Sequence, residues 1–174
     1  MMGRIAGLGI LLCAVIAGGG LYYLQVYGYY RAVPAEQVVI RLTPLDGGAP
    51  QVLAVTEVQA IDAHSSPIRF RACFTLAQAA TDLAGRFETR AEALPRLAPK
   101  WFDCFDAPAL TQALQSGAAT AYLGEKNIAF GVDRIVAIDA QGRGFVWHDL
   151  NDCGDKAYDG TIVGEECPRL PETK

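Results

Sequence analysis

Four of the five cysteines could form disulfides, since Cys73, Cys104, Cys153 and Cys167 all lie in the polar part of the chain. Cys73 and Cys104 each precede a predicted helix, and the other two flank a loop near the C-terminus. Of the three connectivities that four cysteines allow, we expect the sequential one, 73–104 and 153–167. Zinc ribbons and redox pairs need close spacings such as C-x-x-C, which do not occur here. The pattern predicts structural disulfides in an oxidising compartment. Cys13 lies in an apolar run and is read as a small buried residue.

The two histidines are the remaining candidates for acid–base or metal chemistry. His64 lies in a polar loop, and His148 ends a predicted strand before Asp149, Asp152 and Asp155. A small metal or acid–base site there is one interpretation. We favour the plainer interpretation, a strand end that runs into an acidic loop. No Gly-x-Ser-x-Gly, Walker or ordered EF-hand pattern occurs, so no catalytic residue, cofactor or metal site is predicted.

The aromatic block around Cys104 has two interpretations. Trp101, Phe102 and Phe105 surround a predicted disulfide within five residues. Core packing is the default for such side chains. The alternative is an exposed docking patch, because Trp and Phe favour the centres of protein interfaces.

An uncharged, apolar run of twenty residues, 5–24, precedes the polar part of the chain. This length spans the roughly 30 Å hydrocarbon layer of a bilayer as a helix. Five tyrosines follow in the pattern of an aromatic belt at a membrane interface: Tyr22, Tyr23, Tyr27, Tyr29 and Tyr30. A cleaved signal peptide is the alternative, but the run exceeds a typical signal core and lacks a small-x-small cleavage site. We therefore expect an uncleaved signal anchor.

Small residues recur along the anchor, notably Gly3, Gly7, Ala14 and Gly18. Small side chains let helix backbones approach closely in lipid, so this spacing favours contact with partner spans. Arg4 places the N-terminus in the cytoplasm, because positive charges stay on that side. Four cysteines in one small domain suit a periplasmic or extracellular space, where thiols oxidise, and we expect a single-pass protein of the bacterial inner membrane with its domain in the periplasm.

The remaining chain predicts one α+β domain, residues 33–174, after an anchor of residues 1–32. Residues 37–43 and 52–61 predict a hairpin, and 68–74 a strand. A T-x-x-Q capping box at Thr75 predicts a helix that ends at Gly85, and Asp106 is expected to cap a second helix over 107–116. Residues 119–123, 129–139 and 144–150 predict an antiparallel meander, with turns at 124–127 and 140–143. A polar tail, 151–174, follows.

The charge of the chain excludes some partners. All 19 acidic residues lie after Arg31, whereas two of the 15 basic residues, Arg4 and Arg31, lie at or before it. An acidic domain without a basic stripe argues against nucleic acid as a partner, because phosphate contacts need clustered Lys and Arg. It also argues against a domain that lies flat on an anionic lipid surface.

The chain resembles one family over nearly its whole length. The runs that carry the resemblance are 65–74, 101–106 and 145–148 with Cys153. The family comprises short, N-terminally anchored alphaproteobacterial membrane proteins with a domain of unknown function. The resemblance implies this topology and no residue role. We expect a non-catalytic accessory or assembly protein that contacts integral membrane partners. A periplasmic ligand-binding or sensory domain is the alternative, followed by an anchored hydrolase.

Overall fold

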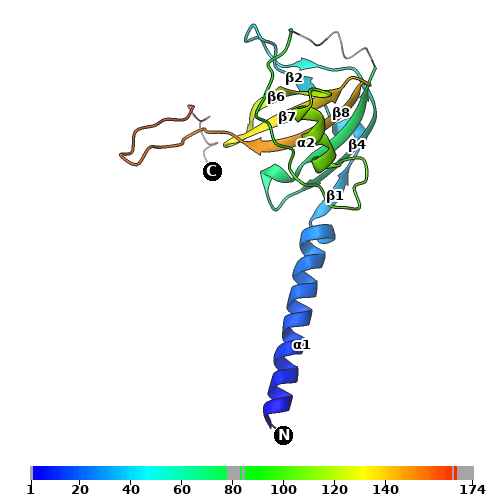
Figure 1. Ribbon diagram of the computed structural model, residues 1–174, viewed down its shortest axis with the longest axis vertical. Helices are drawn as coiled ribbons and strands as arrows, with labels where there is room; N and C mark the ends of the chain where they lie inside the picture. The colour runs from blue at the N-terminus through cyan, green and yellow to red at the C-terminus, as the bar shows by residue number, and fades with distance from the viewer. Residues whose placement is uncertain (1, 78–82, 84, 166, 168–174) are drawn as a thin grey trace.

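The computed structural model describes residues 2–77, 83, 85–165 and 167 of the chain. Figure 1 shows an N-terminal helix that extends away from a sheet domain, and a segment after the last strand that extends sideways. In chain order the elements are α1 (Met2–Tyr23), η1 (Leu24–Gly28), β1 (Tyr30–Val33), η2 (Ala35–Gln37), β2 (Arg41–Leu42), β3 (Gln51–Val52), β4 (Val55–Ala63), η3 (Pro67–Arg69), β5 (Arg71–Leu76), α2 (Ala107–Gln115), β6 (Ala119–Ala129), β7 (Val132–Asp139) and β8 (Arg143–Leu150).

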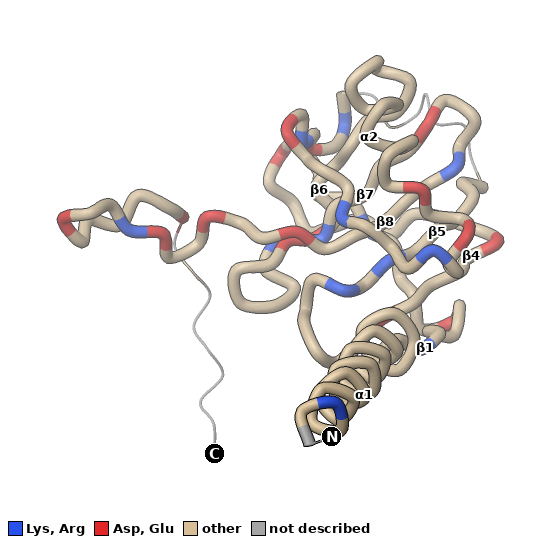
Figure 2. Tube along the Cα trace, turned by 60° about the horizontal axis from the view of Figure 1, so that its bottom comes forward, with Lys and Arg blue, Asp and Glu red and all other residues tan. Residues whose placement is uncertain are grey.

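The N-terminal helix is apolar apart from Arg4 and Gln25 and is exposed along most of its length. It comprises α1 and the π-helical turn η1, and the stretch Gly3–Gly28 is long and apolar enough to cross a membrane. A signal sequence meets the same criteria. The helix thus agrees with the predicted segment for membrane insertion, and Figure 2 shows no acidic residue along it.

Six strands form one antiparallel sheet in the order β1-β4-β5-β8-β7-β6. β1 follows the helix almost directly and pairs with β4, with Tyr30 opposite Ala63 and Val33 opposite Ala60. The sheet therefore begins at Tyr30, within the segment that the sequence assigned to the anchor. β2 and β3 form a hairpin in which Arg41 pairs with Val52, but most of the predicted second strand is β4, which pairs with β1 and β5 instead. The predicted α+β class is confirmed.

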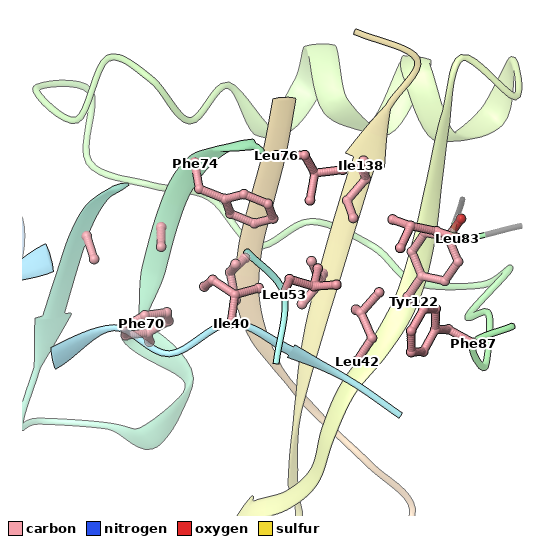
Figure 3. Close-up of a cluster of buried hydrophobic side chains, with 14 residues drawn as sticks. Ile40, Leu42, Leu53, Phe70, Phe74, Leu76, Leu83, Phe87, Tyr122 and Ile138 are labelled. Atoms are coloured by element: carbon pink, nitrogen blue, oxygen red, sulfur yellow. The ribbon is translucent and has the colours of Figure 1, made fainter. Parts of the chain in front are cut away.

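Successive side chains of a strand point to opposite sides of the sheet, and both sides are covered here, so the sheet carries two cores. One face meets the β2–β3 hairpin, through Ile40, Leu42 and Leu53 (Figure 3). The other face packs Trp147 against Phe105 and Leu110, from the loop before α2 and from α2 itself. Both cores are thus built on the central strands.

The predicted meander is present, but its first turn lies elsewhere. β6 continues through Ala129 with bulges around Glu125, and the chain reverses at residues 130–131. Gly124 sits in the strand where an added Cβ would lie 3.0 Å from the carbonyl oxygen of Arg134. Asn127 has a φ of 51°, and its N–H donates to Asp133. Gly124 and Asn127 lie at irregularities of the β6–β7 pairing, and Gly and Asn are favoured in bulges as they are in turns. The predicted turn at 124–127 is therefore wrong.

The two predicted domain helices differ in outcome. α2 begins after Asp106, whose carboxylate accepts a hydrogen bond from the Ala109 N–H at 3.0 Å, so the predicted N-cap is confirmed. Thr75 instead belongs to β5, where its hydroxyl donates to Glu57 at 2.9 Å. The predicted helix start at Thr75 is therefore wrong, and residues 78–82 and 84 of that prediction lie outside the described residues.

Both predicted disulfides are present, as Cys73–Cys104 and Cys153–Cys167. The first joins the central strand β5 to the loop before α2, across 31 positions of sequence. The second closes a loop of the segment after β8. The sequential pairing is confirmed.

Candidate functional site at the junction between helix and sheet

The most distinctive site of the molecule is the contact between the apolar helix and the base of the domain. The indole N–H of Trp101 donates to the carbonyl oxygen of Val26 at 2.7 Å. The guanidinium of Arg69 donates to the carbonyl oxygen of Gln25 at 3.3 Å. The last carbonyls of a helix have no partner within it, and its C-terminus attracts positive charge. Two side chains of the domain therefore cap the end of the helix.

Aromatic rings strengthen the same contact. Tyr27 stacks on Trp101 with ring centroids 6.4 Å apart, and Tyr23 stacks on Tyr27 at 5.9 Å. Tyr30 meets the edge of Trp101 at 6.0 Å and lies under the guanidinium of Arg69 at 5.6 Å. We call these five residues the junction cluster. Because they come from α1, η1, β1, η3 and the loop before α2, they hold the domain in one orientation on the helix.

The structure separates the residues of the predicted docking patch. Phe102 and Phe105 are buried in the second core and are not available to a partner, as the default interpretation of core packing expected. Trp101 is 38% exposed and contacts the helix of its own chain. The predicted tyrosine belt also divides, since Tyr22, Tyr23, Tyr27 and Tyr29 are exposed on the helix and Tyr30 is half-buried in the sheet.

Arg71 lies behind the junction cluster and organises the loops around it. Its guanidinium donates to the carbonyl oxygens of Ile68 and Phe70 on one side, and of Arg96 and Leu97 on the other. The residue is only 4% exposed, and this burial lowers its pKa to about 10. It remains charged at neutral pH, yet it forms no ion pair within the described part of the chain.

An open pocket of about 660 Å³, the basal pocket, lies next to the junction cluster. Its wall includes Tyr30, Arg69 and Arg71, and the loop that carries Leu94, Arg96 and Leu97. Arg96 Nε donates to Asp149 at 2.9 Å, which fixes that loop to the end of β8. Figure 2 shows blue segments on the side of the domain next to α1. Positive charge thus gathers where the domain meets the helix.

His148 is a buried structural residue with both ring nitrogens engaged. Its Nδ1–H donates to the carbonyl oxygen of Pro67 at 2.7 Å, and its Nε2 accepts from Arg134 at 3.1 Å. Phe70 stacks on the ring at 4.8 Å. Burial is the main cause that lowers the pKa of His148, to about 4. His64 is exposed and accepts from Arg31 at 3.2 Å, on the loop after β4. The structure does not bring the two histidines into one site.

Two of the acidic residues that follow His148, Asp149 and Asp159, have hydrogen-bond partners of their own. Asp149 binds Arg96, and the carboxylate of Asp159 accepts the N–H of Thr161. Among the described residues, no three His, Cys, Asp or Glu side chains lie close enough to hold a metal ion.

The small residues of α1 form one narrow face. At about 100° per residue, Gly3, Gly7, Ala14 and Gly18 fall within roughly 60° of the helix surface. An added Cβ at any of the three glycines would meet nothing within 4 Å. The face is open along its length in this chain.

The arginines of the basal pocket are the functional candidates that sequence reasoning missed. Arg69 and Arg71 flank Phe70 in a run that otherwise reads as a buried strand. A charged residue at an inward position of such a strand is the signal that could have indicated them, since buried arginines need specific partners.

Comparison with known proteins gives a family and no activity. The model of a family described as a family of unknown function (DUF6446) matches residues 40–168. Neither the curated proteins nor the solved structures contain a match.

Proposed function

The chain belongs to DUF6446, a family of unknown function, and we propose that it is a non-catalytic accessory protein of a membrane complex. In this proposal the apolar helix stays in the bacterial inner membrane with its N-terminus in the cytoplasm. Its small-residue face binds the spans of integral partner proteins. The sheet domain, with its two disulfides, lies in the periplasm above them.

The observation that carries the proposal is the junction cluster. A domain that needed only a tether would tolerate a loose linker, as Gly- and Ser-rich segments provide. Here the helix end is capped by Trp101 and Arg69, and the first strand starts two residues after η1. A fixed orientation is useful when the helix and the domain must meet one partner together.

The open small-residue face supports the same conclusion. Packing between spans depends on close backbone approach, which Gly7 and Gly18 permit. The engaged ring of His148 supports a non-catalytic role, because neither nitrogen is free to accept a proton from a substrate. His64 is exposed on a loop, and we expect His64→Ala to leave the function unchanged.

The test compares two double variants with equal added bulk. Gly7→Leu with Gly18→Leu fills the small-residue face, whereas Gly9→Leu with Gly20→Leu adds the same volume on the opposite side of the helix. Both keep the span apolar, so both should insert. After mild detergent extraction, the first variant should lose the stoichiometric membrane partner that the native chain and the control retain. Equal partner recovery from all three proteins would contradict the proposal.

A further inference from the structure

We propose that the basal pocket binds the phosphate headgroup of an anionic phospholipid in the leaflet next to the domain. The inference requires that the helix is in a membrane, and it does not depend on the accessory role. It places a specific lipid contact where the sequence argued against a lipid-facing domain.

The position of the pocket is the first argument. Tyr30 in its wall follows the apolar helix directly, and Arg69 in its wall donates to the carbonyl of Gln25 within that helix. A pocket built on the last turn of a membrane span lies at headgroup level, where aromatic belts also lie. Lipid phosphates are therefore the anions present at high local concentration.

The charge of the pocket is the second argument. Three arginines and two acids, Glu92 and Asp149, lie in its wall, and Asp149 is paired with Arg96. Arg71 is a buried cation without an ion pair among the described residues, and Arg69 binds only a carbonyl and a ring there. The acidity of the whole domain does not oppose this, because charges beyond about 10 Å are screened.

The apolar rim is the third argument and favours a lipid over a free anion. Leu94 and Leu97, on the same loop, are 63% and 74% exposed. Two exposed leucines beside arginines fit a ligand with a charged head and a hydrocarbon chain. Inorganic phosphate would use the arginines alone.

The experiment uses the full chain in nanodiscs with equal amounts of phosphatidylglycerol and phosphatidylcholine. Native mass spectrometry after release identifies the lipid that stays bound. We expect preferential retention of phosphatidylglycerol. Arg69→Gln should lower that preference roughly five- to tenfold. One arginine near an anionic membrane surface raises the affinity for that surface by about this factor. Arg143→Gln, the same change at the far end of β8, should leave it unchanged.

Two further variants separate the pocket from its neighbours. Trp101→Phe removes a cap of the helix without removing charge and should keep the preference, so a loss equal to that of Arg69→Gln would overturn the proposal. Leu94→Ser with Leu97→Ser should weaken lipid retention. Indifference to the leucines, together with displacement of the lipid by millimolar inorganic phosphate, would show a small-anion site and refute a lipid site. Equal retention of both lipids would refute it as well.

Discussion

The environment of His148 holds its imidazole neutral. Pro67 accepts its one N–H, Arg134 occupies its other nitrogen, and Phe70 covers the ring. A protonated ring would lose the bond from Arg134 and place two cations together. A side chain that resembled a candidate base in the sequence therefore connects η3 to the sheet.

This environment predicts that stability falls as the solution is acidified. The pKa of His148 is about 4 in the folded chain and about 6.5 when unfolded. Between these values the unfolded state binds the proton and the folded state does not, so stability is full above pH 6.5 and falls toward pH 4. The loss is on the order of 3 kcal/mol. Urea unfolding of the full chain in detergent at several pH values measures it.

The other histidine supplies the control for this prediction. His148→Gln should flatten the dependence between pH 6.5 and 4, at some cost in stability at neutral pH. His64→Gln should keep the native slope, because His64 is exposed. A native slope in the His148 variant would assign the acid sensitivity to other groups.

Among the elements, those with local signals could be predicted from the sequence. α2 carries its own N-cap at Asp106, and β7 and β8 alternate around a short turn. The disulfide pairing followed from the positions of the cysteines. β1 could not be predicted, because its residues continue an aromatic membrane-interface pattern and become a strand only by pairing with β4. The basal pocket was also out of reach, since it joins Tyr30, Arg71 and Arg96 from three distant segments.

The two disulfides are predicted to contribute differently to stability. The Cys73–Cys104 bridge ties the central strand to the loop before α2, so replacing both cysteines by alanine should cost about 3–4 kcal/mol. The Cys153–Cys167 bridge closes a largely exposed segment outside the two cores. Its removal should leave the main unfolding transition nearly unchanged and raise proteolysis within residues 153–167. Chemical denaturation and limited proteolysis of the two double variants measure these effects.

On the scale of the whole molecule, the chain is an exposed apolar helix joined through the junction cluster to a disulfide-bonded sheet domain (Figure 1). Both parts could be predicted from the sequence, because the helix is uncharged and apolar over residues 5–24 and the domain carries all 19 acidic residues. The sequence did not predict that they would be held together. That contact depends on Trp101 and Arg69, whose types suit many other roles.

We predict that the helix remains on the mature protein. The intact mass of protein extracted from membranes should include residues 1–24, since Trp101 and Arg69 bind carbonyls of the helix end. A protease added outside the inner membrane should digest the tail and spare the helix. A mature N-terminus near Leu21 would identify the helix as a signal sequence and contradict the anchor.

The π-helical turn η1 also sets the rotational phase of everything before it. Its five residues, Leu24–Gly28, form wider turns than α1, so each residue there advances the chain around the axis by less. Deletion of one residue from this turn would swing the Gly7 and Gly18 face relative to the sheet by somewhat less than the roughly 100° of an α-helical residue, and would barely change the hydropathy of the helix. Deletion of seven residues from the middle of α1 would shorten the span and nearly preserve the angle. The length of this one turn is therefore under a geometric constraint that the composition of the helix does not reveal.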